Sequence, residues 1–477
     1  MNFERLYING AWVPSTGTDL IQVENPFTMK TFAAVPSGTP EDADNAIAAA
    51  NNAFPAWSNT TLDERIQLMT RFLEIFKNKA QDIIDLEVLE LGSPVTFTKS
   101  AHCDYQFTRI QSYIDLAPTV PMVEKMPYST TYRAPIGVIT CITPWNYPLG
   151  QIVQKVIPAL LMGNTVVLKP SQQTPLTAYV MAQSFHEAQF PAGVFNMVTG
   201  RSGQVGDVLT SHKDVHMISF TGSTSAGIRV SQQALNTVKH ISLELGGKSP
   251  SIILPSTDAS YYESAIRACF NTIFLNSGQT CTALSRLLLP KKDLSTFESI
   301  MNKVIQEYPV GDPNLESTKV GPVASMAQFN TIKSYIEKGI AEGATLFAGT
   351  VPTDPQNGYF INPTIFTNVT NDMVIAREEI FGPVLCVLTY DTVEEAIAIA
   401  NDTTFGLSGA VWGPKEEAIA VAQRMETGNI YINDSIRDTA APFGGWKESG
   451  IGREGGVYGM IEFTQQRTLF DSSDNWK

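Results

Sequence analysis

Apolar residues recur along the whole chain in two alternating patterns, one helical and one extended. A spacing of about 3.6 residues predicts helices over residues 42–54 and 62–91, the second beginning at Asp63 and ending near Gly92. Short runs rich in β-branched residues predict buried parallel strands. These runs lie at residues 136–143, 165–168, 196–198, 217–220, 251–254, 286–289, 384–389, 409–412 and 429–433. The alternation of helix and strand predicts an α/β fold.

One short segment has the pattern of an exposed hairpin strand. Residues 128–133 (YSTTYR) alternate small polar and aromatic side chains between Pro127 and Pro135. Such a strand leaves hydrogen-bonding groups free along its edge. It is therefore a candidate for pairing with another subunit.

The length and charge of the chain limit its class and its partners. At 477 residues the chain has roughly the mass of three ordinary domains. Lys and Arg total 33 against 47 Asp and Glu, which gives a net charge of −14. Proteins that bind phosphate backbones carry clusters of positive charge instead. Nucleic acid and anionic membrane surfaces are therefore not expected as partners.

The apolar stretches and the cysteines indicate a cytoplasmic protein. The start of the sequence lacks the pattern of a secretory signal. The apolar stretch 156–168 is interrupted by Pro158 and Gly163 and is too short to span a bilayer. Five cysteines without a CxxC pair fit a reducing compartment better than a disulfide scaffold.

One cysteine lies where a nucleophile is expected. Cys281 ends the segment NSGQTC, residues 276–281, which follows the helical run 265–275. A cysteine is nucleophilic as its thiolate, which requires a partly exposed site beside a base or an electropositive backbone. The polar neighbours of Cys281 fit such a site. The remaining cysteines are expected to be small buried apolar residues, and they are Cys103, Cys141, Cys269 and Cys386.

Glu244 is a carboxylate between two leucines, in the segment LELGGKSP at residues 243–250. The pattern fits a buried acid held for proton transfer, and it fits equally an acid buried in a structural ion pair. Gly246 and Gly247 follow, and they indicate a backbone that another group approaches closely or a position that needs a positive φ.

Two segments have features of a dinucleotide site. Residues 220–227 (FTGSTSAG) form a Gly-rich turn between a predicted strand and a predicted helix, where backbone N–H groups bind phosphate. The spacing is GSTxxG and not GxGxxG, so an ordinary tight turn stays open as the alternative. Lys169 follows the strand at 165–168, at the edge where open α/β sheets bind ligands. A surface lysine is the alternative there.

Asn146 lies in a loop made rigid by prolines, TPWNYP at residues 143–148. Its side-chain amide is a donor of the type that stabilises an oxyanion, and an ordinary turn asparagine is the alternative. No metal site is predicted. His212 and His216 are four residues apart, but the stretch leads into a strand and not along a helix.

Taken together and in this order, the motifs resemble the NAD(P)-dependent aldehyde dehydrogenase superfamily. The resemblance runs from INGAW at residues 8–12 through PWNYP, VVLKPS, FTGST, LELGGKSP and GQTC to EEIFGPV at 378–384 and PFGGWKESGIGRE at 442–454. It implies a Rossmann-like cofactor domain, an α/β catalytic domain and a small β oligomerisation arm. The implied NAD(P)-binding domain comprises residues 1–119 and 137–246, the catalytic domain 247–450, and the arm 120–136 and 460–477.

The resemblance also implies catalytic roles. Cys281 would attack the aldehyde carbonyl to give a thiohemiacetal, while Asn146 and the backbone N–H of Cys281 would hold the oxyanion. Loss of a hydride to the nicotinamide gives a thioester. Glu244 would then activate water to release a carboxylic acid. The proton relay of the family maps onto Lys155 and Glu454.

A set of residues would bind the cofactor, NAD or NADP, and by resemblance it comprises Trp145, Lys169, Ser171, Gln172, Gly206, Gly222, Ser223, Gly246, Glu379 and Phe381. Trp145 and Lys169 would meet the adenosine ribose. Gly222 and Ser223 would meet the pyrophosphate. The nicotinamide ribose and ring would meet Glu379 with Phe381.

Gln172 is a departure from the pattern of strictly NAD-preferring relatives. These commonly carry a glutamate three residues after the lysine, which binds the ribose 2′-hydroxyl and repels a 2′-phosphate. Without that charge, NADP is expected to be tolerated or preferred.

The residues that line the aldehyde tunnel in relatives map onto Tyr147, Gln151, Gln154, Arg437 and Phe443. Glutamine and arginine among them predict a small polar or acidic aldehyde, because unpaired polar groups buried beside an alkyl chain cost free energy. A surface loop position for Arg437 is the alternative.

Three other functions compete with this interpretation. An enzyme that passes the acyl group to coenzyme A forms no free acid, and Glu244 counts against it. A non-catalytic binding protein on the same fold is expected to lack Cys281, Glu244 or Asn146, yet all three are present. A cysteine hydrolase would need a histidine partner, and none is evident. The resemblance implies a homodimer or homotetramer that acts on a small-molecule aldehyde.

Overall fold

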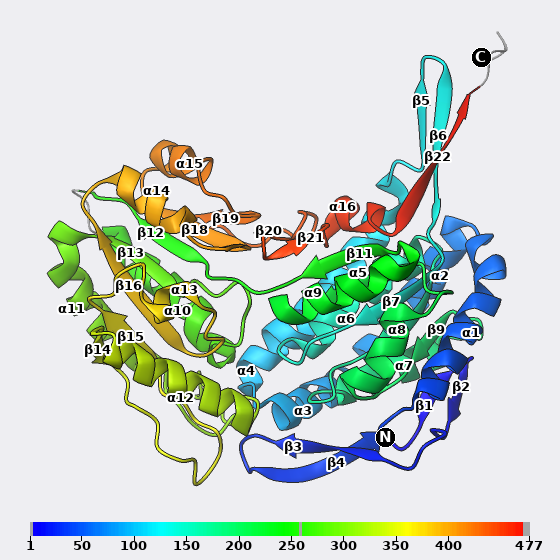
Figure 1. Ribbon diagram of the computed structural model, residues 1–477, viewed down its shortest axis with the longest axis horizontal. Coiled ribbons are helices and arrows are strands. Elements are labelled where there is room, and N and C mark those ends of the chain that lie inside the picture. The colour runs from blue at the N-terminus through cyan, green and yellow to red at the C-terminus, as the bar shows by residue number, and fades with distance from the viewer. Residues whose placement is uncertain (1–2, 257–259, 471–477) are drawn as a thin grey trace.

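The protein consists of two large sheets with helices on their faces, arranged side by side, and a strand arm that projects from one of them (Figure 1). The computed structural model describes residues 3–256 and 260–470. The ends of the predicted ranges 1–119 and 460–477, and residues 257–259 of the range 247–450, lie outside the described residues.

The first sheet has eight strands in the order β2-β1-β9-β8-β7-β10-β11-β21. Strands β9, β8, β7, β10 and β11 are parallel, and the chain order reverses at β7. Such a reversal leaves a crevice at the carboxyl ends of the strands, where open α/β sheets bind ligands. The strands are β1 (Leu6–Ile8), β2 (Ala11–Val13), β7 (Val138–Ile142), β8 (Thr165–Lys169), β9 (Phe195–Met197), β10 (Met217–Thr221), β11 (His240–Glu244) and β21 (Gly450–Ile451).

Helices cover both faces of this sheet (Figure 1). They include α1 (Pro40–Ser58), α5 (Tyr105–Leu116), α6 (Pro148–Leu161), α7 (Leu176–Glu187), α8 (Asp207–Ser211), α9 (Thr224–Ala234) and α16 (Gly456–Ile461). A short helix α4 (Val95–Phe97) and a π-helix (Thr98–Asp104) lead into α5.

The single helix predicted over residues 62–91 is wrong. The chain forms two helices there, α2 (Leu62–Lys77) and α3 (Ala80–Leu91). The N–H of Asn78 donates to the carbonyls of Ile75 and Phe76, which closes α2 with shorter-range bonds than a continuing helix would use. A capping box between Thr61 and Glu64 fixes its start.

The second sheet has seven strands in the order β14-β15-β16-β13-β12-β18-β19, parallel except at β14. Its strands are β12 (Pro250–Ile253), β13 (Arg286–Pro290), β14 (Thr345–Ala348), β15 (Thr364–Thr367), β16 (Val384–Tyr390), β18 (Ser408–Trp412) and β19 (Asn429–Ile432). Its helices are α10 (Ser260–Phe274), α11 (Leu294–Val304), α12 (Met326–Ala341), α13 (Val374–Arg377), α14 (Val393–Asn401) and α15 (Lys415–Ala422). Every buried run predicted as a strand is confirmed as one in these two sheets.

The arm is a three-stranded antiparallel sheet of two distant segments. The predicted hairpin is confirmed as β5 (Val123–Met126) and β6 (Ser129–Pro135), and β22 (Thr464–Phe470) pairs along the other edge of β6. The arm projects beyond the body of the molecule, with Tyr128 and Phe470 more than four-fifths exposed (Figure 1). Smaller antiparallel pairs are β3 (Leu20–Asn25) with β4 (Lys30–Pro36) and β17 (Phe405–Gly406) with β20 (Trp446–Lys447).

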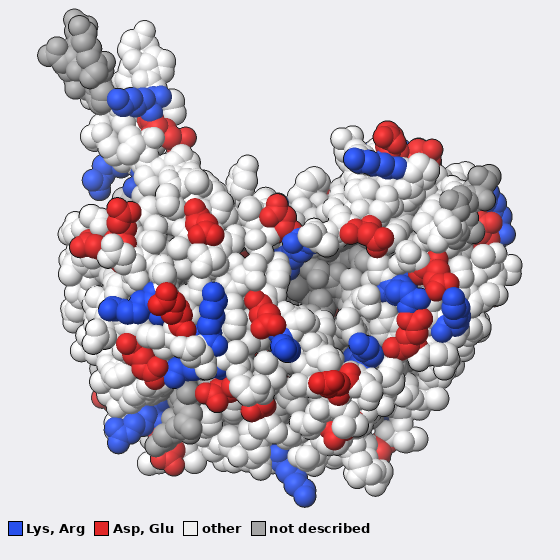
Figure 2. Space-filling model, turned by 180° about the vertical axis from the view of Figure 1, so that it is seen from behind, with Lys and Arg blue, Asp and Glu red and all other residues white. Residues whose placement is uncertain are grey.

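The surface mixes charges of both signs. Lys and Arg side chains alternate with Asp and Glu on the face in Figure 2. No helix among the described residues is long and apolar enough to cross a bilayer. All five cysteines are free; Cys281 is partly exposed and the other four are buried, as the sequence predicts.

Candidate active site

The carboxyl ends of the first sheet and the amino ends of the second sheet meet at one place. Asn146 follows β7, Ser223 follows β10, and Glu244 ends β11. From the other side, Cys281 precedes β13 and Glu379 precedes β16. Two cavities open here, and Cys281 lines both of them.

The first cavity has a volume of about 230 Å³. The rings of Trp145 and Phe381 meet edge to face on its wall, with centroids 5.4 Å apart. Ser223 caps helix α9 by accepting a 3.3 Å hydrogen bond from the N–H of Ala226, so the helix begins at the cavity. The lining residues are Pro144, Trp145, Asn146, Thr221, Gly222, Ser223, Leu245, Gly246, Cys281, Gln328, Glu379 and Phe381.

Glu379 is held at this cavity by the backbone of the opposite segment. Its Oε1 accepts a 2.9 Å hydrogen bond from the N–H of Gly247, and a Cβ on Gly246 would lie 2.6 Å from its Oε2. Gly246 thus permits the close approach that the sequence indicated. Burial raises the pKa of Glu379 to about 7, against the lowering effects of the Gly247 hydrogen bond and Lys248.

Four residues predicted at the cofactor do not line the first cavity, namely Lys169, Ser171, Gln172 and Gly206. Lys169 is buried, and a Cβ on Gly206 would lie 3.9 Å from its Cε. Burial lowers the pKa of Lys169 to about 8. Ser171 Oγ accepts a 3.2 Å hydrogen bond from the N–H of Gln173, and the Gln172 side chain is exposed. Lys169 ends β8 and Ser171 and Gln172 follow it, whereas Gly206 ends a π-helix (Ser202–Gly206).

A left-handed turn presents Cys281. Asn276 and Ser277 have φ of 54°, and Gly278 has φ of 72°. A Cβ on Gly278 would lie 2.1 Å from the carbonyl of Gly382, so only glycine fits there. Gln279 fixes the turn, because its Nε2 donates to the carbonyl of Asn276 and its Oε1 accepts from the N–H of Ala324.

Asn146 points its amide at the same turn. Its Nδ2 donates a 2.9 Å hydrogen bond to the carbonyl of Gln279, and its own carbonyl accepts from Asn276 Nδ2 at 2.9 Å. An amide nitrogen carries two hydrogens, so the second remains for a group bound beside Cys281. The rigid loop predicted around Asn146 thus holds a preorganised donor.

The Cys281 thiol has a raised pKa, to about 12. Burial is the main cause, and the carboxylates of Glu379 and Glu244 add to it, whereas Arg437 lowers it. The protonated thiol is therefore the resting form at neutral pH.

The Glu244 carboxyl is buried, and its oxygens have no hydrogen-bond partner among the described residues. Burial raises its pKa well above the ordinary value, Glu454 raises it further, and Lys155 lowers it. Lys155 Nζ donates to Glu454 Oε1 in a buried ion pair. Lys155 thus pairs with Glu454 and not with Glu244. Glu244 is a buried acid to which none of the described residues bonds a cation.

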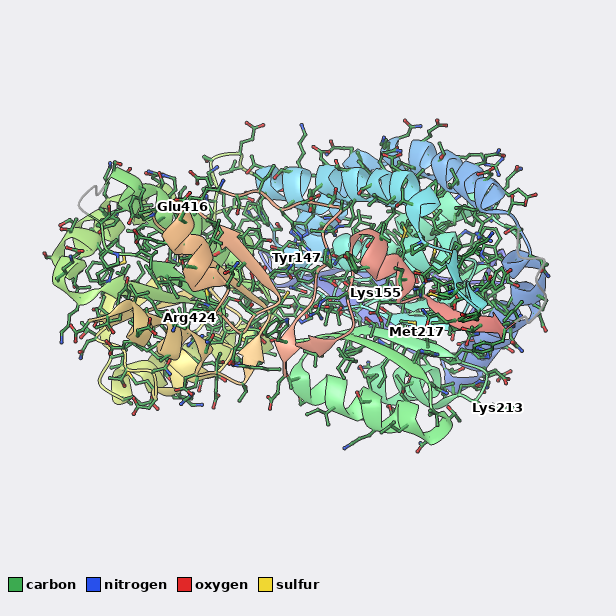
Figure 3. The ribbon with its side chains drawn as sticks, turned by 90° about the horizontal axis from the view of Figure 1, so that it is seen from above. Tyr147, Lys155, Lys213, Met217, Glu416 and Arg424 are labelled. Atoms are coloured by element: carbon green, nitrogen blue, oxygen red, sulfur yellow. The ribbon has the colours of Figure 1, made fainter. Side chains whose placement is uncertain are left out.

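The second cavity has a volume of about 180 Å³ and shares Cys281 with the first. The five residues predicted for the aldehyde tunnel all line it: Tyr147, Gln151, Gln154, Arg437 and Phe443. The Arg437 guanidinium lies 4.4 Å from the centroid of the Phe443 ring, so Arg437 is not a free surface residue. Tyr147 lies between the two halves of the molecule in Figure 3, and its hydroxyl is 2.9 Å from Oγ1 of Thr280, the residue before Cys281.

Comparison with known proteins decides the family. The model of the aldehyde dehydrogenase family matches residues 12–469 of the chain. The chain belongs to the aldehyde dehydrogenase family. It is similar to 3-succinoylsemialdehyde-pyridine dehydrogenase of a Pseudomonas species, with 42% identity over 472 residues and 98% of each chain covered.

Solved aldehyde dehydrogenases share the fold closely. Aldehyde dehydrogenase C of Pseudomonas syringae, a Cys-to-Ala mutant crystallised with NAD+ and octanal, has a TM-score of 0.96 and 40% identity, with 99% of this chain and 98% of that chain covered. The aldehyde dehydrogenase of Mycobacterium tuberculosis complexed with NAD+ has a TM-score of 0.94 and 38% identity, with 98% of each chain covered.

Several residues of this aldehyde dehydrogenase site escape sequence analysis. Tyr105, Gln106 and Arg109 of α5 line the second cavity, and Thr221 and Gln328 line the first. Gln106 and Arg109 lie on the same helix face as Tyr113. This spacing is the one signal in the sequence that the two polar residues face the protein interior and not solvent. In the described part of the chain, no group of three or more His, Cys, Asp or Glu side chains is placed to hold a metal ion.

Proposed function

We propose that the protein oxidises an aldehyde to a carboxylic acid with NAD(P)+ through a covalent intermediate on Cys281. The observation that carries the proposal is the position of Cys281, which lines both cavities. A cofactor in the first cavity and an aldehyde in the second would meet at its sulfur. Membership of the family supports this reaction class.

The residues of the first cavity fit a nicotinamide dinucleotide. The start of α9 at Gly222 and Ser223 offers backbone N–H groups for a pyrophosphate. Glu379 offers carboxylate oxygens for ribose hydroxyls, and Lys169 is a buried cation that forms no ion pair among the described residues. When bound, NAD(P)+ supplies the hydride acceptor. Relatives crystallised with NAD+ support the assignment.

Cys281 and Asn146 would form the intermediate. The sulfur of Cys281 bonds to the carbonyl carbon while its proton leaves, and the carbonyl oxygen becomes an oxyanion. The free hydrogen of Asn146 Nδ2 and the N–H of Cys281 stabilise that charge. The carbon then loses its hydrogen as hydride, the C=O bond re-forms, and Cys281 carries a thioester.

Glu244 would complete the turnover. Its carboxylate takes a proton from water, the water oxygen attacks the thioester carbon, and the C–S bond breaks. The net reaction consumes aldehyde, water and NAD(P)+ and gives carboxylate, NAD(P)H and two protons. Because none of the described residues bonds a cation to Glu244 and its pKa is raised, its carboxylate can accept a proton and release it again. Lys155 and Glu454 lie beside it as the relay.

The test measures NAD(P)H absorbance with a panel of aldehydes that includes octanal, since a relative was crystallised with it. We expect NAD(P)H and free acid to form in equal amounts without coenzyme A, and both to disappear in a Cys281→Ala variant with an unchanged melting temperature. Asn146→Ala should lower kcat about 100-fold or more. Acyl-coenzyme A in place of free acid, with NAD(P)H formed only when coenzyme A is supplied, would establish the acyl-transferring alternative.

The domain division and the assembly are part of the same proposal. We propose residues 1–119 and 137–246 as the NAD(P)-binding domain, 247–450 as the catalytic domain, and 120–136 with 460–477 as the arm. The exposed strands of the arm support pairing between subunits, in a homodimer or homotetramer. Five free cysteines support a cytoplasmic location.

A further inference from the structure

The second cavity is positively charged. Its lining includes Arg109 and Arg437 and no aspartate or glutamate. The arginine ion pairs of the described residues involve other arginines, namely Arg133, Arg229, Arg267, Arg377 and Arg424. Two arginines therefore line one cavity, and neither forms an ion pair with another residue that the structure describes.

Arg109 is buried with donors to spare. It is 7% exposed, and its Nη1 donates to Gln106 Oε1 at 2.7 Å and to the carbonyl of Gly150 at 3.4 Å. A guanidinium has five N–H donors in a planar fork. Besides the two Nη1 contacts, the Arg109 guanidinium lies 4.8 Å from the centroid of the Tyr105 ring, and a hydrogen bond with Tyr105 raises the pKa of Arg109. The other donors of the fork are left for a group bound in the cavity. Burial lowers the pKa of Arg109 and the positive charge of Arg437 lowers it further, against the raising effects of Tyr105 and Tyr113.

The cavity has further polar side chains. Gln151 is 7% exposed and its Oε1 has no partner among the described residues. Gln154 is buried on the same wall. The Arg437 guanidinium lies over the Phe443 ring, and both residues line the cavity. Glu244 does not line this cavity, so it is not the missing counter-ion there.

We propose that this cavity selects an aldehyde that carries a carboxylate, with its carbonyl carbon at Cys281 and its carboxylate bound by Arg109 and Arg437. The inference rests on the proposed function and specifies its substrate class. A carboxylate pairs with a guanidinium through two parallel hydrogen bonds and compensates its charge. An alkyl chain would leave both arginines without an anion, and one of them, Arg109, is buried, which costs free energy.

The test compares 4-oxobutanoate with its methyl ester and with octanal, each with saturating cofactor. We expect kcat/KM for 4-oxobutanoate to exceed that for the ester by at least about 10-fold. Arg109→Met should lower kcat/KM for 4-oxobutanoate about 100-fold through KM and affect the ester much less, while Arg109→Lys should restore part of the loss. Arg424→Met is the matched control, because Arg424 pairs with Glu394 far from Tyr147 (Figure 3) and should leave both substrates unchanged.

A second measurement needs no variant. Succinate, the product expected from 4-oxobutanoate, should inhibit the wild-type protein in competition with the aldehyde, and succinamide should not. A wild-type preference for the ester or octanal, or equal inhibition by both compounds, would overturn the inference while NAD(P)H formation still supports an aldehyde dehydrogenase. If Arg109→Met lowers kcat/KM equally for 4-oxobutanoate and for its ester, Arg109 has a structural role only and does not bind the carboxylate. If none of the aldehydes yields NAD(P)H, the proposed function itself fails.

Discussion

Lys155 and Glu454 are 299 residues apart in the chain and form an ion pair in the interior of the first sheet's helical layer. Helix α6 supplies the lysine, and the chain's return from the second sheet supplies the glutamate. Glu244 lies close enough for both charges to act on its pKa, with Glu454 raising it and Lys155 lowering it. The ion pair therefore stabilises the protein interior and also affects the pKa of Glu244, the acid that we propose acts on the thioester.

Replacing Lys155 by Met should be strongly destabilising. Glu454 would be left as an unpaired buried charge, which costs about 3–5 kcal/mol of unfolding free energy. Denaturation in urea measures the change. Lys79→Met is the control, because Lys79 Nζ and Glu187 Oε1 form a surface ion pair 2.9 Å apart. This variant should lose less than about 1 kcal/mol of unfolding free energy. A loss for Lys155→Met no larger than that of the control contradicts this prediction.

Glu244→Gln should separate the two halves of the reaction. Thioester formation does not need the carboxylate, so one equivalent of NAD(P)H should appear in a burst, followed by slow turnover. In the wild type, hydrolysis should rise with pH through the raised pKa of Glu244, because the ionised form is the base. Rapid-mixing absorbance measures both effects. Steady turnover of Glu244→Gln at the wild-type rate would exclude Glu244 as the base.

Alkylation of Cys281 by iodoacetamide should report the charges around the thiol. Because its pKa is raised to about 12, the rate in the protein without cofactor should rise about tenfold per pH unit between about pH 7 and pH 9. Glu379→Gln removes a carboxylate that raises this pKa, so alkylation should become faster. Glu378→Gln is the control, because the Glu378 carboxylate accepts from the Tyr335 hydroxyl at 2.7 Å instead. Equal alkylation rates in the two variants would contradict the electrostatic explanation.

Gln172→Glu should change the cofactor preference. The exposed Gln172 offers no negative charge to a 2′-phosphate, so the wild type should use NADP with a kcat/KM within about 100-fold of that for NAD. The added carboxylate should lower kcat/KM for NADP at least about 10-fold and leave NAD nearly unchanged. Gln172→Ala is the neutral control and should leave the ratio of kcat/KM for NADP to kcat/KM for NAD unchanged. A wild-type preference for NAD beyond about 100-fold would refute the role of this position.

The sequence by itself determined the local elements and the chemical groups. Period-two and 3.6-residue patterns depend on neighbours along the chain, so nine strands of the two sheets and the hairpin of the arm could be predicted. The sequence analysis did not predict β1, β2, β11, β14, β15 and β21. The break at Asn78 could not be, because both flanking segments have helical periodicity and the end of α2 depends on which carbonyls one N–H reaches. The motifs likewise placed Cys281, Glu244 and Asn146 as candidates before their surroundings were known.

Only the tertiary structure decided what surrounds each group. The paired state of Lys155, the unpaired state of Glu244 and the meeting of two cavities at Cys281 depend on segments hundreds of residues apart. Arg109 is the clearest case, since its helix has an ordinary amphipathic sequence and only packing against α6 buries its charge beside Arg437. The residue type determines the charge and the hydrogen-bonding capacity of a side chain, whereas long-range packing determines its burial and its counter-ion.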